Sequence, residues 1–210
     1  MFSKFKLFTI NFVLFAFLIS FCFAQDEGDY GKLFKSYYKN GQLKSGKLKK
    51  PKVVQDYPCK GKVSFKENGY IHEFTLSKDH KINGVIIPAE SRIEIQIDQK
   101  LIYLSKDTEI KGLLIQQTTG KDDFLLITDK GKLQEFTPKN NVEIENVPCK
   151  GSNKIYLYPD GKLWACTLSA DHEINGKTYT EGTSILIDEK GNAEIFTEAL
   201  LLKMRRRLAN

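Results

Sequence analysis

An internal repeat constrains this chain more than any other feature of its sequence. The stretch 74–84, FTLSKDHKING, returns at 166–176 as CTLSADHEING. A third copy, LSKDTEIKG, occupies 104–112, and a worn copy runs from Phe136 to Asn146. The period is about 30 residues, as in repeat architectures. The isoleucine of the motif recurs as Ile82, Ile110, Ile144 and Ile174, with Val54 in the matching place before Cys59.

A second series of tight turns runs through the chain at a similar interval. Asn-Gly between apolar alternation is a strong hairpin signal, and related dipeptides continue the series. The turns are Asn40-Gly41, Asn68-Gly69, Asp98-Gln99-Lys100, Lys130-Gly131, Asp160-Gly161 and Lys190-Gly191. Alternation in their flanks predicts one shared inward face. The predicted inward residues are Val63, Phe65, Ile93, Ile95, Ile97, Ile155, Leu157, Ile185 and Ile187.

These two patterns predict an all-β protein. A lone hairpin is marginal in water, so neighbouring copies must stack to bury their apolar faces. We expect about five repeats of ~30 residues over 37–196, stacked into an antiparallel sheet or a solenoid-like array. Whether the stack is an open sheet, a solenoid or a rolled barrel-like layer stays open.

The motif also predicts local roles. Glycine at the corner suits a left-handed backbone because it has no Cβ, and the isoleucine two residues earlier is the expected buried anchor. We expect Asp79, Asp107 and Asp171 to accept backbone N–H groups in the turns that they open. Calcium binding is the alternative, but no D-x-D-x-D-G loop surrounds these aspartates.

Residues 1–24 read as a signal peptide: two lysines, an apolar run from Leu7 to Phe21, and small residues before Gln25. The rival interpretation is lipidation at Cys22, against which bulky Phe21 argues. Residues 25–36 are expected to be a flexible tether. Export predicts a cell-surface, outer-membrane or secreted protein, with the periplasm as the alternative.

Export to an oxidising compartment would allow the cysteines to form disulfides. Cys149 and Cys166 lie within one repeat, so they are the predicted disulfide, with Cys59 unpaired. A disulfide across such a loop is worth about 3 kcal/mol by loop-closure entropy. The alternative is that all three are small buried apolar residues.

The C-terminus departs from the repeat. Thr197 can cap a helix over 197–210, with Leu201, Met204 and Leu208 on one face and arginines in the last turn. One interpretation is a helix that covers the edge of the last repeat. The other is a basic helix that contacts an anionic membrane or polyanion surface.

The sequence offers no catalytic constellation. His80 and His172 each follow an aspartate, but they occupy equivalent repeat positions. There is no G-x-S-x-G turn, no phosphate-binding loop and no spacing typical of metal ligands. We therefore expect no enzyme activity, no catalytic or metal site and no cofactor. Trp164 could be a binding hot spot, with packing in a well-formed hairpin as the alternative.

Two stretches resemble a known family. Tyr38-Lys39-Asn40-Gly41-Gln42-Leu43-Lys44-Ser45-Gly46 and Tyr158-Pro159-Asp160-Gly161-Lys162-Leu163 are similar to the MORN-variant repeats of exported bacterial proteins, including a family of antitoxin components. The resemblance implies stacked β-hairpins used as a binding surface. In whole-protein character the chain is also loosely similar to small exported surface adhesins of spirochaete-type bacteria, which implies binding of host matrix proteins.

Charge narrows the partners. The formal net charge is +6, and loss of Lys4 and Lys6 with the leader leaves 6 − 2 = +4. This mild excess is not evidence for nucleic acid. We expect a protein ligand, such as a host matrix protein or plasminogen, or alternatively a bacterial partner in the envelope. The candidate binding residues are Lys47, Lys49, Lys50, Lys52, Trp164, Lys203, Arg205, Arg206 and Arg207.

Overall fold

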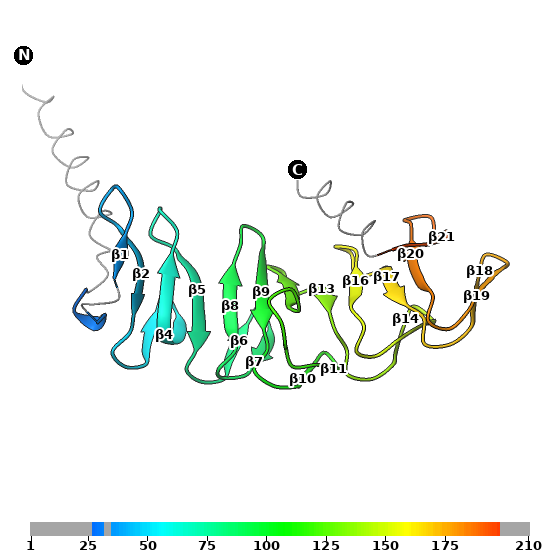
Figure 1. Ribbon diagram of the computed structural model, residues 1–210, viewed down its shortest axis with the longest axis horizontal. Coiled ribbons are helices and arrows are strands. Elements are labelled where there is room, and N and C mark those ends of the chain that lie inside the picture. Colours follow the sequence, from blue (N-terminus) through cyan, green and yellow to red (C-terminus); the bar gives the residue numbers. More distant parts are fainter. Residues whose placement is uncertain (1–26, 32–34, 198–210) are drawn as a thin grey trace, which may run out of the picture.

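The chain folds into a long row of β-hairpins (Figure 1). The structure is a computed structural model that describes residues 27–31 and 35–197. This part is all-β, with strands β1 to β21, a single 3₁₀ turn η1 (Glu27–Asp29) and no α-helix. No helix in it is long and apolar enough to cross a membrane. The expected signal peptide and the residues beyond Thr197, with the predicted C-terminal helix, lie outside the described residues.

Most strands belong to one antiparallel, 13-stranded sheet in which neighbours follow chain order. Five large hairpins, β4–β5, β8–β9, β12–β13, β16–β17 and β20–β21, follow the β1–β2 pair. The strands are β1 (Ser36–Tyr37), β2 (Leu43–Lys47), β4 (Tyr57–Phe65), β5 (Ile71–Leu76), β8 (Arg92–Ile95), β9 (Gln99–Tyr103), β12 (Leu125–Thr128), β13 (Leu133–Phe136), β16 (Ile155–Leu157), β17 (Leu163–Thr167), β20 (Ser184–Ile187) and β21 (Ala193–Ile195). The sheet is therefore open, ending at β1 and β21.

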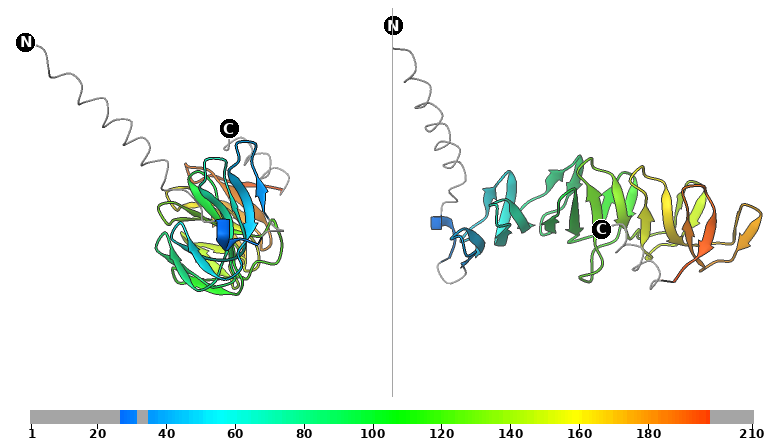
Figure 2. Two further views of the ribbon diagram at one scale, coloured as in Figure 1. Left: turned by 90° about the vertical axis from the view of Figure 1, so that its left-hand side faces the viewer. Right: turned by 90° about the horizontal axis from the view of Figure 1, so that it is seen from above.

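Small two-stranded hairpins alternate with the large ones and form a second layer. They are β3 (Lys52–Val54) with the start of β4, β6 (His80–Ile82) with β7 (Val85–Ile87), β10 (Thr108–Ile110) with β11 (Leu113–Ile115), β14 (Val142–Ile144) with β15 (Val147–Cys149), and β18 (His172–Ile174) with β19 (Lys177–Tyr179). Viewed along the long axis the hairpins form a compact bundle, whereas from above the molecule is long and narrow (Figure 2). Each repeat thus consists of one small and one large hairpin.

The recurring I-x-G motif, which is replaced by V-Q-D at 54–56 and by I-E-N at 144–146, forms the turn of each small hairpin and not a corner between strands as expected. Asn83 (φ 48°) and Gly84 (φ 84°) are both left-handed, which is the conformation that a two-residue type I′ turn requires. The same pair of left-handed residues recurs at 55–56, 111–112, 145–146 and 175–176. The left-handed glycine was predicted correctly, while the left-handed residue before it was not foreseen.

The motif aspartates accept backbone N–H groups, as predicted, but from further along the chain. Asp79 Oδ1 accepts from Ala89 N at 2.8 Å, and Asp171 Oδ1 accepts from Glu181 N at 2.8 Å. Asp107 accepts from Gln117 in the same way, and so does Asn141 from Gly151. In each case the partner is ten residues later, so this bond closes the open end of a small hairpin.

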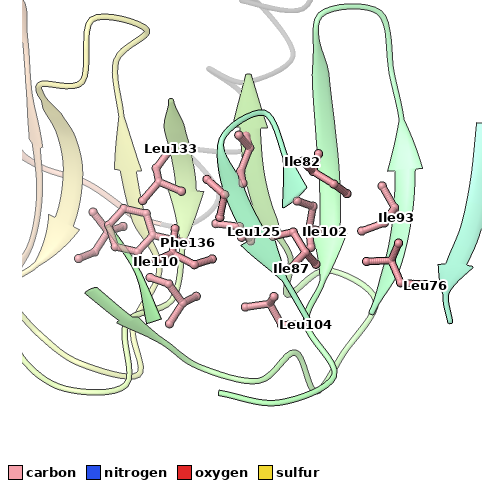
Figure 3. Packing of buried hydrophobic residues seen from close by; sticks show 14 of the residues in the cluster. Leu76, Ile82, Ile87, Ile93, Ile102, Leu104, Ile110, Leu125, Leu133 and Phe136 are labelled. Carbon is pink, nitrogen blue, oxygen red and sulfur yellow. The ribbon is translucent and has the colours of Figure 1, made fainter. Parts of the chain in front are cut away.

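Between the two layers lies one continuous apolar core (Figure 3). Leu76, Ile87, Ile93, Ile102 and Phe136 are almost completely buried there, and each such side chain contributes about 1.5–3 kcal/mol relative to an exposed one. One core position, the end of the second strand of the small hairpin, is filled in turn by Cys59, Ile87, Ile115, Cys149 and Tyr179.

The predicted inward face is confirmed for most positions. Val63, Phe65, Ile93, Ile155 and Ile185 are buried, and Ile95, Leu157 and Ile187 are half-buried. The prediction was wrong for Ile97, which is 86% exposed because the β8–β9 chain turns there.

The segment before β1 contributes to this core. Tyr30 is 4% exposed, pairs with Leu48 and lies edge-on to Phe65. A Cβ on Gly46 would lie 2.7 Å from the Tyr30 ring, so Gly46 leaves the space that the ring occupies. The described part of the expected tether is therefore packed against the first repeat.

Candidate functional site

A groove of about 580 Å³ opens between the turns of the β4–β5 and β8–β9 hairpins. We call it the N-terminal groove. It has both apolar and polar walls, which is typical of sites that bind another molecule. Its apolar lining is Tyr57, Tyr70, Ile71, Ile95 and Ile97, and its polar lining is Gln55, Asp56, Lys66, Asn68 and Gln96.

One wall is held by a contact between the two layers. Gln55, the first left-handed residue of its small hairpin, donates to Gly69 O at 2.9 Å and accepts from Ile71 N at 2.9 Å. We call such a contact, from the first turn residue of a small hairpin to the turn of a large one, a clasp. Tyr57 packs on Phe74 with ring centroids 4.6 Å apart, which fixes its ring. These contacts join this wall of the groove to both layers.

Similar clasps hold three other turns. Glu145 accepts from Leu163 N at 2.8 Å, and Asn175 donates to Gly191 O at 3.1 Å. Lys111 donates to Gly131 O at 2.7 Å. Asn83 passes over the β8–β9 turn and donates instead to Thr128 O at 2.9 Å. Among the described contacts, the β8–β9 turn therefore receives no clasp.

The opposite wall is this unclasped β8–β9 turn. Gln96 N donates to Gln99 O at 3.0 Å, which leaves Ile97 and Asp98 as a two-residue loop. The turn leans toward the next hairpin, because Asp129 N donates to Asp98 O at 3.1 Å and Lys100 pairs with Asp129 at 2.5 Å. Because the β8–β9 turn leans toward β12–β13, it leaves the groove open between itself and the β4–β5 turn.

The groove presents two exposed hydrophobic side chains from opposite walls. Tyr70 is 56% exposed and Ile97 is 86% exposed. Burial raises the pKa of the Tyr57 hydroxyl, with smaller contributions from Asp129 and Asp56. Tyr57 is therefore a neutral donor at ordinary pH. The arrangement can bind an amphipathic segment, with apolar contacts at its rims and hydrogen-bonding groups between them.

A second groove, of about 920 Å³, lies between the β16–β17 and β20–β21 turns. Its charged lining is Glu145, Asp160, Lys162, Glu173, Asp188, Glu189 and Lys190. The hydrogen bond from Lys162 N lowers the pKa of Asp160, and the bonds from Asn192 lower that of Asp188. Both carboxylates accept backbone hydrogen bonds within their own hairpin turns. Their role is therefore to stabilise these turns.

The structure describes four of the predicted basic residues. Lys47, Lys49, Lys50 and Lys52 are exposed near the first repeat. Lys49 donates to Gly28 O at 2.7 Å and Lys52 pairs with Asp29, so these two hold the segment before β1. Lys203, Arg205, Arg206 and Arg207 lie outside the described residues.

All three described cysteines are buried free thiols. A hydrogen bond with Cys149 and burial raise the pKa of Cys166, so the two side chains are neighbours. Burial raises the pKa of Cys59 to about 12. The disulfide between Cys149 and Cys166 stays a prediction, as does lipidation at Cys22, which is not described.

Trp164 lies outside the core cluster although it is only 9% exposed. Its ring is edge-on to Tyr156 at 5.9 Å and tilted to Tyr158 at 6.1 Å. In the part of the chain that the structure describes, no three His, Cys, Asp or Glu residues are grouped to hold a metal ion.

Sequence reasoning missed the N-terminal groove. Its signal was present in the sequence: the β8–β9 turn lacks the glycine found in the other turns of its series, and it carries Ile97. Comparisons with protein-family models, curated proteins and solved structures found no match to this chain.

Proposed function

We propose that this chain is a non-catalytic binding protein, exported to the cell surface, whose N-terminal groove holds a segment of a partner protein. A host matrix protein or plasminogen is the proposed class of partner. The observation that carries the proposal is the exposed Ile97, in a turn that faces Tyr70 across the groove.

Local stability does not explain Ile97. Two-residue hairpin turns favour Asn-Gly or Asp-Gly in the left-handed conformation, and all five small hairpins use left-handed pairs. Neither Ile97 nor Asp98 has a positive φ, and a β-branched apolar residue there gains nothing from burial. A position that breaks a local rule without a compensating contact is a candidate for function.

The surroundings of Ile97 match the anatomy of a protein interface. Binding hot spots combine apolar or aromatic anchors with neighbours that exclude water, and tyrosine is enriched among them. Here Tyr70 and Ile97 are the anchors, while Lys66, Asn68 and Gln96 form a polar rim. The predicted signal peptide and the resemblance to MORN-variant repeats support an exported binding role.

The test is binding of residues 25–210 to immobilised matrix proteins, plasminogen and heparin, at low salt and at about 0.5 M salt, where charge contacts are screened over a few ångströms. The variant is Tyr70→Ser with Ile97→Ser. Its matched control is Ile86→Ser, because Ile86 is 63% exposed but lies outside the groove.

The proposal expects saturable, salt-resistant binding to one or two proteins. The double variant should lose at least about tenfold in affinity, as for two hot-spot residues, and Ile86→Ser should not. Binding only to heparin and only at low salt, or equal binding by the double variant, contradicts it.

The alternative is a periplasmic or envelope protein that docks a bacterial partner, using the same groove. The same resemblance supports it, since a hairpin stack implies a binding surface without specifying its compartment. Protease treatment of intact cells separates the two: a surface protein is cleaved, and a periplasmic one is protected.

A further inference from the structure

The N-terminal groove offers a partner several hydrogen-bond donors that the fold itself does not use. Among the contacts of residues 27–31 and 35–197, no hydrogen bond or ion pair uses the Tyr57 hydroxyl, the Asn68 Nδ2 group or the Lys66 Nζ group. Asn68 accepts from Tyr70 N through its Oδ1 at 3.2 Å, so both of its amide protons remain available. Asp56 is the one carboxylate in the described lining. The groove therefore favours an occupant that is rich in acceptors.

The topology excludes an occupant that binds as an added β-strand. Strand addition requires a sheet edge with unpaired N–H and C=O groups. The groove lies between β5 and β8, which pair with each other through Phe74 and Ile93, and each of these strands has a second partner in β4 or β9. The edges of the main sheet are β1 and β21. The occupant must therefore be held by side chains.

The lining also disfavours an amphipathic helix. Helix anchors at i, i+4 and i+7 extend over about 10 Å and require one continuous apolar face. Here the exposed Tyr70 and Ile97 come from opposite walls, and polar side chains lie among them. A helix would place its apolar stripe against the donors of the groove and leave them unpaired, which costs binding free energy.

A proline-rich segment in the polyproline II conformation has the complementary chemistry. Proline has no backbone N–H, so such a segment presents apolar rings and carbonyl acceptors without donors of its own. Aromatic-lined grooves are the sites at which these segments dock, and Tyr57 and Tyr70 supply aromatic rings here. The partial negative charge of the carbonyl oxygens matches the donor groups of Tyr57, Lys66 and Asn68.

The spacing of the two walls matches as well. Residues i and i+3 of a polyproline II helix lie on one face, about 9.3 Å apart. Successive large hairpins of the main sheet are separated by two strand spacings, about 9.6 Å. A P-x-x-P segment laid across the β4–β5 and β8–β9 turns therefore presents one proline to each wall.

We propose that the N-terminal groove recognises a proline-rich segment of the partner in the polyproline II conformation. One proline packs on Tyr70 and the proline three residues later packs on Ile97. Tyr57, Lys66 and Asn68 donate to the carbonyl oxygens between them. This inference rests on the proposed function, because it names the kind of segment that the groove holds.

The probe is a fluorescein-labelled, end-blocked oligoproline of about ten residues, which makes about three turns of the helix. Fluorescence anisotropy measures its binding to residues 25–210, which contain every described strand. The comparison peptide is a neutral amphipathic helix of leucine, alanine and glutamine. We expect saturable binding of the oligoproline and not of the helical peptide. Because the probe is uncharged, its affinity should be nearly equal at low salt and at about 0.5 M salt.

Asn68→Asp is the most specific variant. It keeps the acceptor for Tyr70 N, as Asp160 does in the β16–β17 turn, but it replaces the amide donor with a carboxylate that repels carbonyl oxygens. The affinity for oligoproline should fall at least about tenfold, while the melting temperature should change little. The matched control is Asn40→Asp, because Asn40 makes the same turn bond at 3.0 Å outside the groove. It should bind like the unmodified chain.

Tyr57→Phe provides a second variant that introduces no charge. It removes the hydroxyl donor but keeps the ring that packs on Phe74. The affinity for oligoproline should fall about fivefold, as for one hydrogen bond. Circular dichroism and thermal unfolding check that each variant is folded. Unchanged oligoproline binding in both Asn68→Asp and Tyr57→Phe, or groove-dependent binding of the helical peptide in its place, overturns the proposal.

The result can be separated from that of the proposed function. If the double variant at Tyr70 and Ile97 loses a protein of the binding panel, but oligoproline neither binds nor displaces that protein, the groove keeps its function and the proline-rich segment is wrong. If oligoproline binding depends on Asn68 and no panel protein binds, the kind of segment is confirmed and the proposed class of partner is wrong.

Discussion

The turns at Thr128–Lys132 and Gln96–Gln99 belong to neighbouring hairpins of one sheet but are held in opposite ways. The first receives both the Asn83 and the Lys111 side chains, while the second receives neither. The first turn is therefore bound to the layer of small hairpins, whereas the second borders a groove and carries the exposed Ile97. The candidate binding site therefore lies beside the turn that neither side chain reaches.

A large effect is expected at Gly131, which lies against the backbone of Asn83. Gly131 has φ 74°, and an added Cβ would fall on Asn83 O. Gly191 has φ 82° but nothing within 4 Å of such a Cβ. Gly131→Ala should cost about 3 kcal/mol of unfolding free energy, and Gly191→Ala about 1 kcal/mol, which is the left-handed penalty alone. Denaturant titration measures both, and equal losses would show that the Asn83 contact is not tight.

Alkaline pH should weaken the repeat that carries the clasped wall of the groove. Burial raises the pKa of Cys59 from 9.0 to about 12 and that of Tyr30 from 10.0 to about 12. Both groups are then neutral when folded but ionise when unfolded, so their stabilisation is complete below pH 9 and is lost as pH rises toward 12. Each group lowers the unfolding free energy by about 1.4 kcal/mol per pH unit in its window.

Denaturant titrations at pH 8, 10 and 11 measure this loss. Cys59→Val should remove the Cys59 share, since apolar residues fill the same position at Ile87 and Ile115. A flat pH dependence, or an unchanged one in Cys59→Val, contradicts the assignment.

A smaller effect is expected from removing one of the aspartates that close the open end of a small hairpin. Asp171→Ala should cost about 1 kcal/mol, because Glu181 N loses its acceptor. Asp171→Asn should cost less than about 0.5 kcal/mol, because Asn141 already makes this bond to Gly151 N at 2.8 Å. Thermal unfolding separates the two variants, and an equally large loss in Asp171→Asn would mean that the negative charge, not the hydrogen bond, is needed.

The smallest effect on stability is expected from a substitution that makes the unclasped β8–β9 turn resemble the other turns. Ile97→Asn with Asp98→Gly supplies the dipeptide that a two-residue turn favours and should stabilise the fold by about 0.5–1 kcal/mol. The same change removes an anchor of the groove, so partner binding should fall while the melting temperature rises. A variant that keeps full affinity would exclude Ile97 from the interface.

The sequence predicts the repeat, the all-β class, the left-handed glycines and the acceptor role of the motif aspartates, because each depends on residues close together in the chain. It does not predict that Asn83 skips one hairpin to reach Thr128, since this depends on how distant hairpins stack. The error at Ile97 has the same origin. Alternation continues through Ile93, Ile95 and Ile97, and only the pairing of Gln96 with Gln99 shows that the strand has ended.

The site shows the same limit. Charge alone does not predict that Lys49 and Lys52 contact the segment before β1. The groove residues come from three separate stretches, 55–57, 66–71 and 95–97, and only the stacking of the hairpins brings them together.

Hydrogen exchange of residues 25–210, measured with and without the partner identified by the binding panel, is the most direct test of the N-terminal groove. Backbone amides at 55–57, 66–71 and 95–97 should exchange more slowly in the complex, while those at 188–192 should not change. Protection at the β16–β17 and β20–β21 turns, or on the outer strands of the small hairpins, without protection at 95–97 would contradict it.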